Sequence, residues 1–499
     1  MARHYRISIW FNNRMDIRES SSALRRILTA VLAVVAAGQL WAAPAVAELR
    51  NGEPGAQAAC DRIEGDLAEA IDEAGVPGAT VAVVTPESVD VRAVGEDAAG
   101  EALEPDAAML WGSVSKPIAA TVVMRLVEEG RLALDDPVSE YLQEMPTTDP
   151  RFRSITIRQL LNHTSGLPFG AEFLDVDAPG RRASDVIAAM EDLELVGDPG
   201  GAYSYSSVGF VFVQAVIEEV EGEGLAEVES RLFPGVGELD DVSPGARFVG
   251  NRALSWRTPR DGAGLGYGYQ GGSVGALAGF VQDSFGERGA GEIDEMIEEP
   301  VDSSGGGSMG LGWRVRADGV VWHTGTVPGY FSAVHIDRER QVAVVVTMNA
   351  SGLLPEEQLL GITEDLFEEV RGNEGDGGGF GGSPVGLLIL LGVAAVVLVV
   401  VGLGIRLRGG RVRAAFWLAG SLVVGLCGWW LLPALLEVPA RYLWLWVPEV
   451  AIAFTLIPIA LFGVGVWSAF RSRERGRPRA RTGRGQQRRG AVGSGSAHP

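Results

Sequence analysis

Short apolar runs mark the strands of a folded region between residues 48 and 371. Residues 79–95, ATVAVVTPESVDVRAVG, hold two valine-rich runs around a Pro-Glu-Ser turn, which predicts a pair of strands. The run VAVVVTMN at 342–349 predicts another buried strand, with its partner near SAVHID at 332–337. We therefore expect a β-sheet in this region.

Helical periodicity, with apolar positions three and four residues apart, dominates other parts of the same region. The predicted helices are residues 117–130, 185–193, 208–222 and the amphipathic 355–370, which we expect to close the domain against the sheet. These patterns alone predict a mixed α+β fold, long enough for one large core or two subdomains.

Residues 27–47 are an apolar, alanine-rich run that follows Arg25 and Arg26 and ends in Ala-Val-Ala. This pattern is typical of a secretory signal peptide with a small-residue cleavage site, so we assign residues 1–47 to a signal and expect the mature chain to begin near Glu48. The alternative is an uncleaved signal anchor, because the run is about long enough to span a bilayer. Both interpretations predict export.

The composition changes abruptly after residue 371. Residues 372–384 are glycine-rich with little apolar content and are predicted to form a flexible linker. Three apolar runs of membrane length follow within residues 385–470, at about 385–405, 414–436 and 443–469. We therefore predict three transmembrane helices.

Arginines beside these runs predict the orientation. Four arginines lie between the first and second runs, and nine lie in the tail, residues 471–499, whereas the connection 437–441 is nearly neutral. The positive-inside rule makes the first connection and the tail cytoplasmic and leaves residues 48–371 outside. Glu449 lies inside the third run but near its outer end, so we interpret it as an interfacial residue rather than a functional intramembrane carboxylate.

The net charge is divided unevenly along the chain. The total of −22 consists of +4 for residues 1–47, +11 for residues 384–499 and therefore −37 for the exported region between them. Such a negative surface excludes a nucleic-acid partner and predicts a strongly solvated domain. The arginine-rich tail could contact anionic lipids, but its role as a topology signal is sufficient.

The chain contains one lysine, Lys116, three positions after Ser113 in WGSVSKP. If a helix opens near Ser113, the two side chains share one face. A desolvated lysine with a lowered pKa can take the proton of a serine hydroxyl, whereas an arginine cannot, so the pair is a candidate nucleophile and base. The alternative is a surface lysine near a helix-capping serine.

Two later motifs support the catalytic interpretation, namely YSYSSVGF at 203–210 and HTG at 323–325. The ordered set SVSK, YSS and HTG resembles the serine beta-lactamase and penicillin-binding-protein superfamily, in its class C beta-lactamase, DD-peptidase and esterase branch. The resemblance covers about residues 60–370 and includes the segments GVPGATVAVV (75–84), LVEEGRLALDDPVSEYL (126–142), ITIRQLLNHTSGLP (155–168) and HTGTVPGY (323–330).

This resemblance implies an antiparallel β-sheet flanked by helices, with an inserted helical subdomain and the active site between them. It also implies that Ser113 is acylated, that Lys116 is its base, and that Tyr205 relays a proton to the leaving group. The oxyanion would be bound by the backbone amides of Ser113 and Thr326. Substrate-binding positions would be Ser207, His323, Thr324 and Gly325.

Two of these positions depart from the family pattern. Ser207 replaces the usual asparagine, whose amide can bridge the lysine and the substrate, and His323 replaces the lysine of class C beta-lactamases. Histidine is mostly neutral at pH 7 and is common at this position in esterase-like members. The departures therefore favour esterase-like chemistry over efficient beta-lactam hydrolysis.

Other residues that could carry chemistry are isolated. His163, in LLNHTSGLP, precedes a turn and is interpreted as part of a structural loop. Cys60 and Cys427 have no partners at zinc-ligand spacing, so we expect no metal, and the proposed chemistry needs no cofactor.

The sequence thus predicts a membrane-tethered, extracytoplasmic serine hydrolase that acts through an acyl-enzyme on an ester or amide, including peptide or beta-lactam-like substrates. Its predicted partners are that substrate and the cytoplasmic membrane. One alternative is a receptor that is acylated by a beta-lactam or wall peptide without release. Another is a transport or assembly module with an inactive hydrolase-like ectodomain, which the intact SVSK and HTG motifs disfavour.

Overall fold

The computed structural model describes residues 56–143, 145–146, 149–239, 241–303, 307–353, 355–373 and 410–475. The predicted signal, most of the predicted linker, the first predicted apolar span and most of the tail lie outside these residues. The chain divides into two compact units, one of which contains the predicted hydrolase domain together with residues 434–450. The other contains most of the two apolar helices near the C-terminus.

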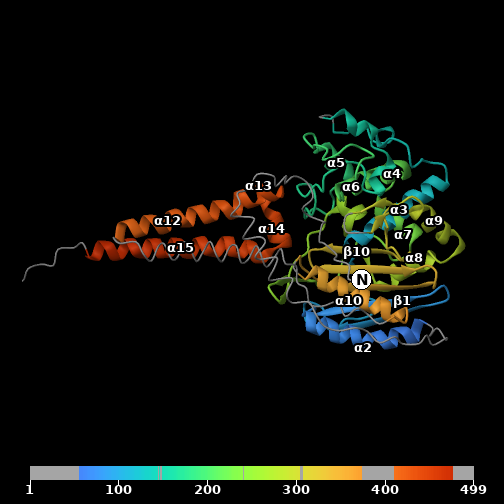
Figure 1. The fold of residues 1–499 in the computed structure, drawn as a ribbon, viewed down its shortest axis with the longest axis horizontal. Helices are drawn as coiled ribbons and strands as arrows, with labels where there is room; N and C mark the ends of the chain where they lie inside the picture. Colours follow the sequence, from blue (N-terminus) through green and yellow to red (C-terminus); the bar gives the residue numbers. More distant parts are fainter. Residues whose placement is uncertain are drawn as a thin grey trace, which may run out of the picture. The chain divides into compact units, whose positions relative to one another are not determined.

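The first unit is built on an antiparallel sheet (Figure 1). Its strand order is β2-β1-β12-β11-β10-β9-β8-β7. These strands are β1 (Gly78–Val84), β2 (Val89–Gly95), β7 (Val301–Asp302), β8 (Ser308–Met309), β9 (Arg314–Val315), β10 (Val321–Val327), β11 (Tyr330–Asp337) and β12 (Val342–Met348). Smaller sheets contain β3 (Met109–Leu110) with β6 (Gly271–Gly272), and β4 (Ala246–Val249) with β5 (Arg252–Ser255) and β13 (Ala350–Ser351).

Helices cover both faces of the main sheet, with α2 and α10 on one side (Figure 1). The helices of this unit are α2 (Ala56–Ala74), α3 (Ser115–Glu128), α4 (Ile157–Leu161), α5 (Ala183–Ala188), α6 (Val208–Glu221), α7 (Leu225–Leu232), α8 (Val274–Asp283), α9 (Glu287–Ile297), α10 (Glu356–Val370) and α14 (Ala440–Trp446). Short 3-10 helices precede α3 at Gly112–Val114, called η1, and lie at Val138–Glu140, Pro150–Ser154 and Gly262–Gly264, with a π-helical turn at Leu265–Tyr269.

Strand β1, next to the edge strand β2, explains how one sheet supports two cores. Its residues are all buried, and successive side chains point to opposite faces. Val81 and Val83 join the cluster beneath α2 and α10, whereas Ala82 and Val84 join the larger cluster on the other face, with α3, α6 and α8. Because both faces of β1 are buried, its residues are nearly all apolar, as the sequence pattern predicts.

The predicted α+β class and the antiparallel sheet are confirmed. The predicted strands at 79–95, 332–337 and 342–349 are present as β1 with β2, β11 and β12. The helix predicted at 185–193 is shorter in the structure and ends at Ala188. After Ala189 the chain forms tight turns at Met190 and Leu193.

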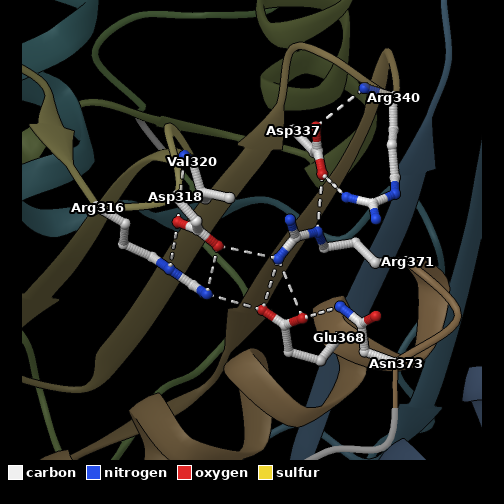
Figure 2. Close-up of polar contacts among 8 residues, drawn as sticks. All are labelled: Arg316, Asp318, Val320, Asp337, Arg340, Glu368, Arg371 and Asn373. Atoms are coloured by element: carbon white, nitrogen blue, oxygen red, sulfur yellow. Dashed lines mark hydrogen bonds and ion pairs between the residues drawn. The ribbon is translucent and has the colours of Figure 1, made fainter. Parts of the chain in front are cut away.

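An ion-pair network fastens the end of α10 to the sheet (Figure 2). Arg371, which is 8% exposed at its side chain, donates Nε–H to Asp337 Oδ2 at 2.7 Å, at the end of β11. It also pairs with Glu368 Oε1 at 3.0 Å and with Asp318 Oδ2 at 3.2 Å, in the turn before β10. Ion pairs as well as apolar packing therefore hold α10, the closing helix that its amphipathic pattern predicts, against the sheet.

Within the described residues, two helices are long and apolar enough to cross a membrane, Gly410–Leu436 and Pro448–Ser472. The first consists of α12 (Gly410–Leu426), a π-helical turn at Cys427–Leu431 and α13 (Leu432–Leu436), and the second lies within α15 (Pro448–Arg475). They pack together around Trp417, Val424 and Leu461, and Ser421 Oγ donates to the carbonyl of Pro458 at 2.8 Å.

The structure thus supports two apolar helices here, whereas the sequence predicts three spans. The helix that contains most of the predicted span 443–469 begins only at Pro448, and residues 440–446 form the separate helix α14. Val447 between them has a non-helical backbone, with φ −138° and ψ 63°, and a proline favours the first position of a new helix. The predicted span 385–405 lies outside the described residues.

Candidate active site

Ser113 lies in η1, which runs directly into α3. Gly112 begins this turn with a left-handed φ of 53°, and a side chain there would overlap the backbone of Gly325 and Thr326. Only glycine allows both the backbone angle and this close approach to β10. The turn therefore places the hydroxyl of Ser113 beside the edge of the sheet.

Lys116 lies one helical turn after Ser113, as the spacing predicts. Its Nζ is 3.0 Å from Ser113 Oγ and 2.8 Å from the carbonyl oxygen of Tyr267. The side chain is fully buried, and burial and the positive charge of Arg314 lower its pKa well below the ordinary value, against a smaller effect of Asp175. Burial therefore favours the neutral amine over the charged ammonium.

Tyr205 also lies beside Lys116, with its ring centre 5.0 Å from Nζ. Burial raises the pKa of Tyr205, while the charge of Arg314 and a hydrogen bond with Ser113 act in the opposite direction. The phenol therefore stays protonated at neutral pH and can exchange a proton with its neighbours.

The HTG motif forms part of β10, where burial alternates along the strand. His323 is 1% exposed, and its Nδ1 is 2.6 Å from the carbonyl oxygen of Thr324. Burial, with the charges of Arg314 and Lys116, lowers the pKa of His323 well below its ordinary value. This histidine therefore carries no positive charge at neutral pH, and Thr324 is half-buried beside it.

Gly325 brings the two expected oxyanion donors together. A β-carbon there would overlap the carbonyl oxygen of Trp111 and lie 2.7 Å from the amide nitrogen of Ser113. Ser332, its partner on β11, donates its hydroxyl to the same Trp111 carbonyl at 2.6 Å. The amides of Ser113 and Thr326 thus flank one tight contact between η1 and β10.

The outer edge of β10 is open beside these amides. β9 pairs with β10 only at Val321 and Trp322, so no neighbouring strand covers residues 323–327 on that side within the described residues. An extended substrate can bind to such an edge by backbone hydrogen bonds.

Ser207 lies two residues after Tyr205 at the start of α6 and is 4% exposed. No hydrogen bond joins its hydroxyl to Ser113 or Lys116 in the part of the chain that the structure describes. The neighbouring Ser206 donates its hydroxyl to the Pro168 carbonyl at 2.6 Å. The structure therefore places Ser207 next to the site without a direct contact to its centre.

His163 lies in a turn with a left-handed φ of 59° and packs against Tyr205, with 4.4 Å between ring centres. Its Nδ1 accepts the backbone N–H of Ser206 at 3.2 Å. Burial lowers the pKa of His163 well below its ordinary value, so it is neutral. These contacts agree with the predicted structural role, because they fix the segment that carries Tyr205.

The sequence did not indicate two charged residues at this site. Arg314 on β9 is half-buried, with its guanidinium carbon 5.7 Å from the ring centre of Tyr205 and 5.5 Å from that of Trp322. Glu356, at the start of α10, accepts the Thr326 hydroxyl at 2.9 Å. Neither lies in a motif, and only the fold brings them to residues 205 and 326.

Among the described residues, no three His, Cys, Asp or Glu side chains are grouped so that they could hold a metal ion. The side chains around Ser113 are instead an amine, a phenol and a neutral imidazole. This set is suited to proton transfer and acylation.

Comparison with known proteins identifies the family of this chain. The family model named Beta-lactamase matches residues 61–366. The chain belongs to the beta-lactamase family. The recognition of penicillin-binding-protein-like serine hydrolases from SVSK, YSS and HTG is thereby confirmed.

The relatives of this chain carry names that refer to different activities. The chain is 32% identical over 166 residues to penicillin-binding protein 4 of Amycolatopsis lactamdurans, covering 32% of this chain and 43% of that protein. It is 31% identical over 153 residues to esterase EstB of Burkholderia gladioli, covering 27% and 38%. The matches thus span less than half the length of either relative.

Solved structures share the fold. The octameric penicillin-binding protein homologue of Pyrococcus abyssi has a TM-score of 0.55 at 24% identity, covering 64% of this chain and 78% of that one. The D-amino acid amidase of Ochrobactrum anthropi has a TM-score of 0.54 at 18% identity, covering 63% and 99%. These likenesses establish the beta-lactamase-like α+β architecture of the first unit.

Proposed function

We propose that this chain is a membrane-tethered, extracytoplasmic serine hydrolase that acts through an acyl-enzyme on ester or amide substrates. The proposal rests above all on the 3.0 Å distance between Lys116 Nζ and Ser113 Oγ, at a fully buried lysine whose pKa is lowered. A buried neutral amine at that distance can accept the hydroxyl proton and activate the nucleophile.

In the proposed reaction, Ser113 Oγ attacks the carbonyl carbon of the substrate while its proton passes to Lys116. The negative oxygen formed on the substrate is bound by the backbone N–H groups of Ser113 and Thr326. A proton then moves through Tyr205 to the leaving alcohol or amine, the bond to the leaving group breaks, and the acyl-enzyme remains. Water attacks this ester in the second half, with the same groups returning the proton to Ser113.

The substrate would lie along the open edge of β10, against His323, Thr324 and Gly325, with Ser207 nearby. Arg314 supplies the positive charge that a neutral His323 cannot, so we assign it the role of attracting a substrate carboxylate. The names of the relatives, which include penicillin-binding proteins, an esterase and an amidase, support small ester, amide or peptide substrates.

Tethering and location are part of the proposal. The helices Gly410–Leu436 and Pro448–Ser472 are candidate membrane anchors, and residues 385–405 are a candidate third. The arginine distribution supports a cytoplasmic tail and an external catalytic domain, which agrees with a signal at residues 1–47.

A receptor that is acylated but not released is the second candidate. It is favoured by α14, which contacts the catalytic domain and connects in sequence to an apolar helix on each side. Turnover distinguishes the two functions, because a receptor retains its acyl group.

The test uses the full-length chain in detergent, incubated with small esters, a fluorescent penicillin, D-amino-acid peptides and a fluorophosphonate, followed by intact mass and product release. We expect one acyl group per chain and turnover of at least one substrate, both lost in Ser113→Ala. The matched control is Ser115→Ala, since that hydroxyl is buried and has no hydrogen-bond partner among the described residues. Undiminished labelling of Ser113→Ala would exclude the assignment.

A further inference from the structure

Helix α14 packs on the catalytic domain instead of continuing an apolar span. Its residues Tyr442 and Leu443 are only 4% and 2% exposed, although they stand next to segments of membrane-like composition. Pro439 precedes α14 and Pro448 follows it, so neither neighbouring helix continues into it.

Arg441 of α14 holds one loop of the catalytic domain. Its guanidinium donates to the carbonyl oxygens of Ala171 at 3.3 Å, Glu172 at 2.8 Å and Leu174 at 3.0 Å. Three carbonyls around one cationic group require a curved backbone, which continues into the left-handed φ of 56° at Asp175. The conformation of the loop at 171–175 therefore directs these carbonyl oxygens toward Arg441.

Asp175 joins α14 to the interior of the catalytic domain. Its Oδ2 accepts the indole N–H of Trp446 at 2.9 Å, and its Oδ1 accepts the hydroxyl of Tyr269 at 2.9 Å. Its own backbone N–H donates to the hydroxyl of Tyr267 at 2.9 Å. The side chains of α14 and of the turn 265–269 thus meet at one buried aspartate.

That turn also holds the proposed catalytic base, because the carbonyl of Tyr267 accepts from Lys116 Nζ at 2.8 Å. We propose that α14 is a positioning element of the active site, in which Trp446 and Arg441 fix Asp175 and thereby the Tyr267 carbonyl that orients Lys116 toward Ser113. This inference rests on the proposed function of Ser113 and Lys116.

A second set of contacts fixes α14 from the side of the small sheet. Arg247, on β4, donates to the carbonyl oxygen of Trp444 at 2.9 Å, and its guanidinium carbon lies 5.3 Å from the ring centre of Trp256. Burial lowers the pKa of Arg247 to about 10, which reflects how far this contact is removed from water. Such a desolvated pairing is costly to form without a defined partner, so it indicates specific docking.

Tyr442 of α14 is buried and is influenced by charged groups near the site. Its ring stacks on Trp446 with 5.7 Å between centres. Burial raises its pKa, and the negative charges of Asp175 and Glu356 raise it further. Glu356 also accepts the hydroxyl of Thr326, so one carboxylate acts on both α14 and the strand that carries the oxyanion amide.

The charge state of Asp175 controls how many partners it can hold. An ionised carboxylate accepts charge-assisted hydrogen bonds from both Trp446 and Tyr269, whereas a protonated one carries an O–H on one oxygen and accepts more weakly there. Burial raises the pKa of Asp175 to about 6, although Trp446 and Tyr269 act to lower it. The other titratable or charged groups that face it are Tyr267, Asp261, Tyr442, Arg441, Arg247 and Lys116.

The test compares the full-length wild type and Trp446→Phe in nanodiscs, with the rate of fluorophosphonate labelling followed by intact mass. We expect labelling to be slower by about 10-fold, the size of effect that follows from losing one supporting hydrogen bond, with an unchanged final labelled fraction. Trp430→Phe is the matched control, since Trp430 is 72% exposed and far from this contact in sequence.

Two further measurements separate positioning from a purely structural role. Trp446→Phe and Asp175→Asn should be non-additive, because both act on the same hydrogen bond: Trp446→Phe removes its donor, and asparagine has one acceptor oxygen where the carboxylate has two. The labelling rate of the wild type should fall as pH decreases through about 6, the pKa of Asp175. In Trp446→Phe this decrease should begin at higher pH, since a donor that lowers the pKa of Asp175 is gone, and Asp175→Asn should retain only the decrease that protonation of Lys116 causes.

Wild-type rates in both variants would overturn the positioning role while leaving the proposed function intact. A reduced labelled fraction with an unchanged rate constant would overturn it as well, since it would mean that α14 only supports folding. Absence of labelling in the wild type itself would instead contradict the proposed function.

Discussion

The Nζ atom of Lys116 lies 3.0 Å from Ser113 Oγ and 2.8 Å from the carbonyl oxygen of Tyr267, with no exposed surface on the side chain. A neutral amine can donate one N–H to the carbonyl and still present its lone pair to the serine hydroxyl. A charged ammonium has no lone pair and would be costly to bury here. The geometry therefore favours the form of lysine that a general base requires.

The first prediction concerns Lys116→Arg, which keeps a positive group and removes the titratable amine. We expect the fluorophosphonate labelling rate to fall at least about 100-fold, since a positioned base is worth that much. The matched control is the reverse type of exchange at the surface, Arg182→Lys, where the side chain is 71% exposed. A near-normal rate in Lys116→Arg would mean that position 116 acts only as a cation.

The second prediction is a pH profile. Burial, followed by the charge of Arg314, lowers the pKa of Lys116, so the fraction of neutral amine and the rate of ester hydrolysis should rise as pH increases through that lowered value. Arg314→Gln removes a repelling charge, lets Lys116 hold its proton more firmly, and should move this rise to higher pH. Arg182→Gln is the control. If the pH profiles of wild type and Arg314→Gln coincide, Arg314 does not lower the pKa of Lys116.

The sequence predicted the parts of the fold that depend on local pattern. β1 and β12 are valine-rich, mostly apolar runs, and the i, i+3 relation of Ser113 and Lys116 follows from helical geometry. The helix at 440–446 could not be predicted in the same way, because its residues 443–446 are as apolar as the predicted membrane span that they begin. What separates it from α15 is Pro448 together with tertiary contacts of Arg441.

The candidate site was predictable only where motifs carry it. His323 and Tyr205 were found through their order in the chain, and their closeness to Lys116 agrees with that order. Arg314 lies on a strand of two residues, too short for any periodicity, and Glu356 reads as an ordinary charge at a helix start. Their effect on the site comes from strand pairing and packing, which a single sequence does not encode locally.

The third prediction concerns the network in Figure 2. Arg371→Gln leaves the Asp337 carboxylate, which is 5% exposed at its side chain, with Arg340 as its remaining charged partner. We expect a loss of about 2 kcal/mol in the free energy of unfolding, measured by thermal unfolding of the full-length chain in detergent. Arg182→Gln, which breaks an exposed pair with Asp185, should cost less than about 1 kcal/mol.

The same variant has a defined pH dependence. Burial alone would raise the pKa of Asp337, but hydrogen bonds from Arg340 and the charge of Arg371 hold it below its ordinary value. A carboxylate whose pKa is lower in the folded state stabilises the protein at pH values above its unfolded-state pKa of about 3.9. This stabilisation is lost as the pH falls through the folded-state pKa. The difference between wild type and Arg371→Gln should therefore shrink below about pH 4, and a constant difference would mean that the loss is one of packing.

The last prediction addresses the substrate. His323 is neutral because burial lowers its pKa, so Arg314 is the positive group that we assign to a substrate carboxylate. Arg314→Gln should reduce acylation by a penicillin relative to a neutral ester by about 10-fold or more, the scale of one charge-assisted hydrogen bond. The ratio of the two rate constants matters, because any change in the pKa of Lys116 affects both substrates alike. His323→Gln is the matched comparison, since it replaces one neutral polar side chain by another and should leave the ratio unchanged. A ratio that changes in His323→Gln but not in Arg314→Gln would place the selection for charge on the HTG strand itself.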